Sequence, residues 1–100
     1  MYLRVIEKKE WNETIVAICD AELIGRVLRE GEVTLDLERY KSFYVGEKVG
    51  AEEAARELKK ATTANLVGEK AVGIALKLGL ATSKQVKTVE KIPHLQLYRV

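Results

Sequence analysis

A thiol and an imidazole occur once each in this chain, at Cys19 and His94, so a nucleophile–base pair would have to use these two residues. A nucleophilic cysteine needs partial exposure and a lowered pKa, which a helix N-terminus or a neighbouring cation provides. Cys19 precedes a predicted capped helix, but it also ends an apolar run that begins at Ile15. A cysteine at a buried strand end behaves as a small hydrophobe, so we favour a structural role and assign no catalytic residue.

His94 has no cysteine, second histidine or paired carboxylates at ligand spacing, so we expect no metal site. No cofactor motif is present either, because the glycine-rich stretches lack the ending of a phosphate loop. We favour a hydrogen-bonded structural histidine over a catalytic or ligand-binding one. Alternation in the last predicted strand puts His94, Gln96, Tyr98 and Val100 on one face and Leu95, Leu97 and Arg99 on the other.

Asn65 and Glu69 are four residues apart, and we expect them one turn apart on a buried helix. Buried polar groups need partners, so this pair predicts either a packing contact or a polar pocket. The candidate binding residues of that pocket are Ser42, Tyr44, Asn65, Glu69, His94 and Gln96. The alternative is that the polar groups only tie a loop to the helix.

The composition indicates a protein of a reducing compartment. Charged residues make up 32% of the chain, whereas asparagine and glutamine occur only at Asn12, Asn65, Gln85 and Gln96. With one cysteine and one methionine, this is typical of a thermophile. No apolar run reaches the roughly 20 residues of a membrane span, so we expect a cytoplasmic protein without a membrane partner.

Charge is distributed unevenly along the sequence. Residues 1–53 carry 12 acidic and 8 basic residues, whereas residues 54–100 carry 3 acidic and 9 basic ones. An anionic partner is therefore expected at the second half, and RNA or a ribonucleoprotein is the candidate. The basic residues that would contact it are Lys59, Lys60, Lys70, Lys77, Lys84, Lys87, Lys91 and Arg99. Aromatic residues are few there, which favours contact with the phosphates of structured RNA over base stacking. The alternative is that these residues form a charged, solvated surface with no partner.

The first half of the chain has the alternation of β-strands. Residues 2–9 and 13–20 predict a hairpin that turns around Trp11 and Asn12. The second strand is apolar on both faces from Ile15 to Cys19, so we place it in the middle of the sheet.

Asp20 is expected to cap a short helix that ends at Gly25, because an aspartate accepts the free N–H groups of a first helical turn. A strand with one polar face is predicted at residues 33–38, and residues 39–50 are predicted to form a loop.

Two helices follow, at residues 51–61 and 64–79. The second is apolar around most of its circumference and should be the more buried. Its internal glycines are expected where another backbone comes close, and Gly79 is expected to end it in a left-handed conformation.

Residues 87–91 and 94–100 predict a final hairpin or bent strand around Pro93, which has no N–H to donate to a ladder. These elements predict one α+β domain over residues 1–100: a small mixed, mostly antiparallel sheet with a helical pair packed on one face.

The stretches AICDAELIG, REGEVTLDL, SFYVGE, TTANLVGEKAVGIALKLGL and IPHLQ together resemble an archaeal family catalogued as domain of unknown function 424. The resemblance covers nearly the whole chain and implies an archaeal, cytoplasmic protein with no established activity. It marks as family-pattern residues Asp20, Gly25, Ser42, Tyr44, Gly46, Asn65, Gly68, Glu69, Pro93, His94 and Gln96.

Our leading hypothesis is an uncharacterised, non-enzymatic binding or assembly module that associates with RNA or the ribosome. The alternative is a small-molecule enzyme or ligand-binding protein whose pocket is formed by Ser42, Tyr44, Asn65, Glu69 and His94, which requires these five side chains to converge. A third possibility is a homodimer that pairs through a sheet edge or the alanine-rich helix.

Overall fold

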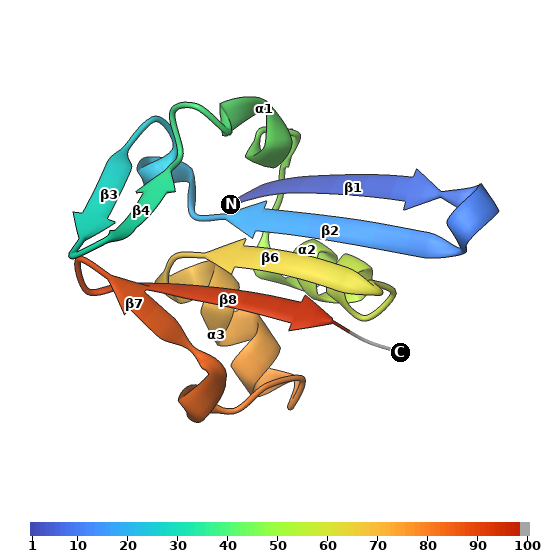
Figure 1. Ribbon diagram of the computed structural model, residues 1–100. Coiled ribbons are helices and arrows are strands. Elements are labelled where there is room, and N and C mark those ends of the chain that lie inside the picture. Colours follow the sequence, from blue (N-terminus) through green and yellow to red (C-terminus); the bar gives the residue numbers. More distant parts are fainter. Residues whose placement is uncertain (99–100) are drawn as a thin grey trace.

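The computed structural model describes residues 1–98 and shows a mixed sheet with a pair of helices packed on one face (Figure 1). The elements in chain order are β1 Tyr2–Lys8, β2 Glu13–Cys19, β3 Val27–Glu30, β4 Val33–Asp36, α1 Lys41–Tyr44, β5 Glu47–Lys48, α2 Ala51–Leu58, β6 Thr63–Val67, α3 Glu69–Lys77, β7 Lys87–Val89 and β8 Ile92–Tyr98. Single 3-10 turns occupy Lys9–Trp11, Ala21–Leu23 and Ser83–Gln85. Arg99 and Val100, which we placed on the last strand, lie outside the described residues.

The six-stranded sheet has the order β5-β1-β2-β6-β8-β7, and β2 lies in its middle as predicted. Neighbouring strands are antiparallel except β2 and β6, which run parallel. The predicted α+β class and the mixed, mostly antiparallel sheet are therefore confirmed.

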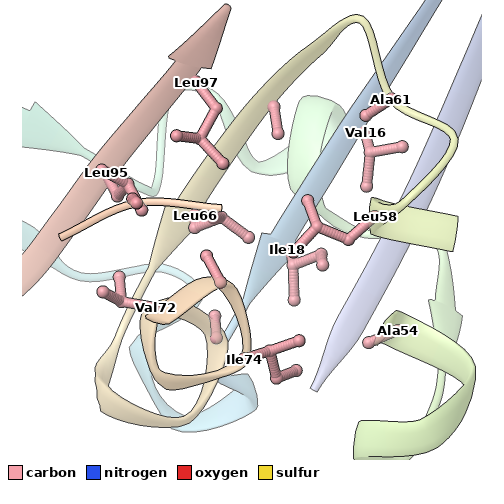
Figure 2. Packing of buried hydrophobic residues seen from close by; sticks show 14 of the residues in the cluster. Val16, Ile18, Ala54, Leu58, Ala61, Leu66, Val72, Ile74, Leu95 and Leu97 are labelled. Atoms are coloured by element: carbon pink, nitrogen blue, oxygen red, sulfur yellow. The ribbon is translucent and has the colours of Figure 1, made fainter. Parts of the chain in front are cut away.

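Helices α2 and α3 cover one face of the sheet with a continuous apolar core (Figure 2). Ile18 and Leu66 extend from the central strands and are fully buried against Val72 of α3 and Leu58 of α2. Full burial of one such side chain contributes about 1.5–3 kcal/mol, so this layer holds the helical pair on the sheet.

The opposite face is covered only at one end, by α1 and by the β3–β4 hairpin (Figure 1). There Leu28, Leu37 and Tyr44 pack against Cys19 and Val67. Further along the same strands, side chains on this face are half-buried or exposed, with the small Ala17 between them. We call this region the open face and define it by Arg4, Ile15, Thr63, Asn65, Gln96 and Tyr98.

The helix predicted at residues 64–79 is wrong in its first turn, because Thr63–Val67 form β6 and the helix begins only at Glu69. Gly68 separates the two elements with φ 107° and ψ 159°, a conformation that favours glycine. Segment 63–67 has apolar residues on both faces, and the periodicity of such a short run does not distinguish a buried strand from a buried helix. The strand is selected by ladders to β2 and β8.

Other terminations follow the predictions more closely. Gly79 ends α3 with φ 73°, and the N–H groups of Gly79 and Leu80 donate to the carbonyls of Leu76 and Ala75, a Schellman motif. Pro93 is the second residue of β8, and the hairpin turns at Glu90 and Lys91, which both have positive φ. The segment predicted as a loop over 39–50 instead contains α1 and β5.

Candidate functional site

Asn65 and Gln96 form a side-chain pair on the open face. They lie directly opposite each other on β6 and β8, and Gln96 Nε2 donates to Asn65 Oδ1 at 3.1 Å. This is the only hydrogen bond that either side chain makes within residues 1–98. The Asn65 amide group and the Gln96 carbonyl oxygen are therefore left to bind water or a ligand.

Arg4 lies in the same row of the sheet. The strand registers align Arg4 with Ala17, Ala17 with Asn65, and Asn65 with Gln96. Because neighbouring strands are about 4.8 Å apart, the backbones of Arg4 and Asn65 are roughly 10 Å apart, with the short Ala17 side chain between them. The Arg4 guanidinium donates to the backbone carbonyl of Ser42 in α1, which holds a positive charge at this end of the row.

His94 and Tyr98 occupy the same face of β8, on either side of Gln96. Tyr98 is 74% exposed. A shallow pocket of about 170 Å³ is lined by Gln85, Lys87, His94, Gln96 and Tyr98. Burial, with a smaller effect from the Lys87 charge, lowers the pKa of His94, so its ring is neutral near pH 7 and offers one donor and one acceptor.

Tyr44 and Ser42 border the open face and do not extend into it. Tyr44 is 5% exposed and meets Phe43 edge to face, with ring centroids 5.1 Å apart. Burial, with a contribution from Cys19, raises the pKa of Tyr44 to about 12, so the phenol stays protonated. Ser42 is exposed and contributes its backbone carbonyl to Arg4.

Glu69 is separated from the other predicted site residues. It is the first residue of α3, on the helix-covered side of the sheet, and it is exposed. The predicted one-turn spacing to Asn65 is wrong because Asn65 belongs to β6. Glu69 instead helps to line a separate pocket of about 250 Å³ together with Asp20, Arg26 and Lys70. The five-residue pocket of the small-molecule alternative is therefore not assembled.

Asp20 does not cap the helical turn that follows it, which corrects the prediction from local sequence. Its carboxylate is 3% exposed and accepts the backbone N–H groups of Lys70 at 3.0 Å and Ala71 at 2.9 Å, at the start of α3. The carboxyl ends of the parallel strands β2 and β6 are thus tied together. Because Asp20 occupies these donors, the N-terminus of α3 has a structural partner of its own.

Cys19 and His94 do not form a catalytic pair. Cys19 pairs with Val67 and Val67 with His94, so the two lie on alternate strands, roughly 10 Å apart at the backbone. Cys19 is fully buried, and burial, followed by the charge of Asp20, raises its pKa to about 12. The thiol donates to the Asp20 carbonyl at 3.3 Å, which supports the structural interpretation.

The structure adds Arg4 and Tyr98 to the residues proposed from sequence, and it places Lys87, one of the predicted basic residues, beside His94. Tyr98 was placed on the correct face by alternation, and Arg4 follows from the hairpin register, which pairs it with Ala17. Lys87 required the β7–β8 register, in which it lies opposite His94. Among residues 1–98, no cluster of three or more His, Cys, Asp or Glu side chains has the arrangement of a metal site. None of the helices described is long and apolar enough to cross a membrane.

Comparisons with known proteins locate the chain by family and by fold. A solved structure described as an uncharacterized conserved protein from Methanopyrus kandleri matches it with a TM-score of 0.82 and 24% identity, covering 99% of this chain and 90% of that one. This likeness shows the fold. No curated protein matches the chain. The model of the family described as "Protein of unknown function (DUF424)" matches residues 9–100, and the chain therefore belongs to that family.

Proposed function

We propose that this protein is a non-enzymatic binding module that holds a single-stranded segment of RNA, free or within a ribonucleoprotein such as the ribosome, on its open face. One observation carries the proposal: the Asn65–Gln96 pair leaves hydrogen-bonding groups unused beside the exposed ring of Tyr98. Side-chain amides read the edges of bases, and sequence-specific recognition of RNA takes place largely on unpaired bases that stack on aromatic rings.

The sparing use of amide residues supports this assignment. Asn12 adopts a left-handed conformation in the β1–β2 turn, and Gln85 accepts the N–H of Thr82 at the start of a 3-10 turn. Local backbone geometry thus accounts for these two. Asn65 and Gln96 have no such task, because their strands are held by backbone ladders and their mutual bond faces outward. Their position on the open face fits recognition better than packing.

Charges at both ends of the row suit the phosphates of a bound strand. Arg4 lies beyond Ala17 on one side, and Lys87 lines the pocket beside His94 on the other. Lys70 and Lys77 belong to α3, on the other side of the sheet. The basic contribution therefore comes from a few residues around the open face. We therefore propose a short single strand that stacks on Tyr98, in place of the structured RNA expected from the sequence.

We also propose a cytoplasmic location, where an RNA or ribosomal partner would be met. The composition, with few amides, one cysteine and one methionine, supports a thermophilic source, and the family resemblance supports an archaeal one.

The test is fluorescence anisotropy with labelled single-stranded RNAs on the order of 10 nucleotides long, compared with an RNA duplex. We expect the single strands to bind more tightly, with affinity that falls steeply as salt is raised. Tyr98→Ala should weaken binding by about 10-fold or more, the usual value of one stacked base. Tyr40→Ala is the matched control, because Tyr40 is 54% exposed and lies outside the open face.

Two outcomes would contradict the proposal. One is no binding at low salt to any of the single strands. The other is a preference for duplex that Tyr98→Ala and Tyr40→Ala leave equally intact, which would indicate phosphate contact without the open face.

A further inference from the structure

The outer edge of β1 is a strand edge that the sheet leaves partly unpaired. β5 pairs with Tyr2 and Leu3 only, so Arg4–Lys8 have no strand neighbour on that side within residues 1–98. On the other side, β1 is paired to β2 without interruption from Tyr2 to Lys8. The free part of the edge is therefore straight, regular and held in extended conformation.

The hydrogen bonds between the residue before β1 and the segment after β5 show which backbone N–H and C=O groups of β1 point outward at this edge. Met1 and Val49 exchange both of their backbone hydrogen bonds, at 2.9 and 3.3 Å. Alternate residues of an antiparallel strand direct their N–H and C=O to the same side, so Leu3, Val5 and Glu7 share the orientation of Met1. Leu3 is opposite Glu47 of β5, which leaves the N–H and C=O of Val5 and Glu7 facing outward without a strand partner among the described residues.

A groove of about 380 Å³ lies beside this edge, between β1 and α2, and three of its four charged residues are acidic. Glu47 comes from β5, and Glu53 and Glu57 come from α2. Arg4 also lines the groove, but its guanidinium is engaged with the carbonyl of Ser42 in α1. Glu57 contacts Lys60 at 3.6 Å in an exposed, weak ion pair, whereas Glu47 and Glu53 have no ion-pair partner among residues 1–98.

We propose that the outer edge of β1 binds an extended, basic peptide segment of another protein as an added strand. The backbone groups of Val5 and Glu7 supply hydrogen bonds that do not depend on the sequence of the peptide. Specificity comes from alternation: residues of the added strand opposite Val5 and Glu7 point to the same side as these side chains, toward α2. There they meet the carboxylates of Glu7, Glu53 and Glu57, so the peptide carries lysine or arginine at every second position.

Natural sheets protect such edges with prolines, bulges or charged side chains. Between Arg4 and Lys8 this edge has no proline and no bulge, and although Arg4, Glu7 and Lys8 are charged, Val5 is 36% exposed on it. The groove shares Arg4 with the open face, but the proposed strand binds to the backbone of Val5 and Glu7 and to side chains on the helix side of the sheet, so this proposal is tested separately from RNA binding.

The experiment is NMR titration of the isotope-labelled, full chain with three short peptides of equal length. The first has lysine at alternate positions between valine and threonine, the second has the lysines replaced by glutamates, and the third has the first sequence with N-methylated backbone at the positions that would bond to β1. We expect the first alone to bind, with its largest amide shifts at residues 4–8. Glu53→Gln combined with Glu57→Gln should weaken binding by about 5-fold or more. Glu22→Gln, outside the groove, should leave it unchanged.

Equal binding of the acidic peptide, equal binding of the N-methylated peptide, or shifts confined to β7 at the other edge of the sheet would each overturn the proposal. A dimer in light scattering that Val5→Lys converts to a monomer would overturn it too, because the edge would then belong to a second copy of the chain.

Discussion

Asp20 and Gly68 touch so closely that no side chain fits at position 68: a Cβ built there would come within 2.6 Å of the Asp20 Cβ. Gly68 has φ 107°, and its N–H donates to the carbonyl of Pro93 at 2.9 Å. Strands β2, β6 and β8 thus converge on one residue that links β6 to α3. The contact fixes where the strand stops and the helix begins.

Replacing Gly68 should therefore destabilise the fold strongly. Gly68→Ala is expected to lower the free energy of unfolding by about 3 kcal/mol or more, from backbone strain and overlap with Asp20 together. Denaturant unfolding at neutral pH measures this change. Gly73→Ala in the middle of α3 is the matched control, since a Cβ there meets no atom within 4 Å and alanine favours a helix by about 1 kcal/mol. A Gly68→Ala protein as stable as the Gly73→Ala protein would refute the role given to this contact.

The surroundings of Gly68 and Gly73 also test what we expected of the glycines in and before α3. We expected another backbone close to its internal glycines, and this prediction is wrong: the atoms close to Gly68 belong to the Asp20 side chain, and a Cβ at Gly73 would meet no atom within 4 Å.

Removing the Asp20 carboxylate should have a cost that a surface aspartate does not have. Asp20→Ala leaves the buried N–H of Ala71 without a partner, and we expect a loss of about 3 kcal/mol in the free energy of unfolding. Asp36→Ala is the matched variant, because Asp36 also accepts two backbone N–H groups, from Glu38 and Arg39, in an exposed turn. Its loss should stay near 1 kcal/mol or below. Equal losses would show that the long-range tie between β2 and α3 adds nothing.

Local patterns predicted the parts of the fold that are determined locally. The β1–β2 hairpin, α2 and the Schellman end at Gly79 each follow from alternation, helical spacing or a single glycine. The failures involve partners distant in sequence. Asp20 bonds to Lys70 and Ala71, about fifty positions away, and β6 is a strand because β2 and β8 flank it. Neither fact is contained in the residues next to them.

The same distinction applies to the candidate site. Alternation along β8 placed His94, Gln96 and Tyr98 on one face without knowledge of the fold, and the structure has them there. Asn65 joins them through the β6–β8 register, whereas Glu69 was grouped with Asn65 only because a helix was expected between them.

Alkaline pH should unfold this protein through two buried groups. Burial raises the pKa of Cys19 from 9.0 to about 12 and that of Tyr44 from 10.0 to about 12. Because the folded-state values exceed the unfolded ones, their contribution to stability is complete below pH 9 and is lost as the pH rises toward 12. Each group lowers the free energy of unfolding by at most about 1.4 kcal/mol per pH unit in that window.

Chemical denaturation between pH 8 and pH 11 tests this linkage. Cys19→Ala and Tyr44→Phe should each flatten the decline, whereas Tyr40→Phe, at an exposed ring, should leave it unchanged. A decline that neither core variant alters would assign the alkaline transition to other groups.

Acid should act through His94 in a separate window. Burial lowers its pKa below the ordinary 6.5, and the Lys87 charge adds to this effect. The unfolded chain therefore binds a proton more readily, so the stability that His94 provides is complete above pH 6.5 and falls as the pH drops through the folded-state pKa. Thermal melts between pH 7.5 and pH 5 should show a declining midpoint that is flatter in Lys87→Ala and nearly absent in His94→Gln. A melting midpoint of the unmodified chain that is constant from pH 7.5 to pH 5 would disagree with this account.

Variants of Asn65 and Gln96 distinguish a structural role of this hydrogen-bonded pair from a role in RNA recognition. If the bond stabilises the fold, Asn65→Ala, Gln96→Ala and the double variant should reveal a coupling near 1 kcal/mol in the free energy of unfolding. We expect less than about 0.5 kcal/mol, because Gln96 is exposed and water replaces the lost partner. Affinity for single-stranded RNA should behave differently. Either substitution alone should remove most of the base recognition, so the double variant should be only slightly weaker than each single one. Additive losses in affinity would mean that the two amides bind independently, unchanged affinity would mean that neither contacts the RNA, and a large coupling in stability would assign the pair to the fold.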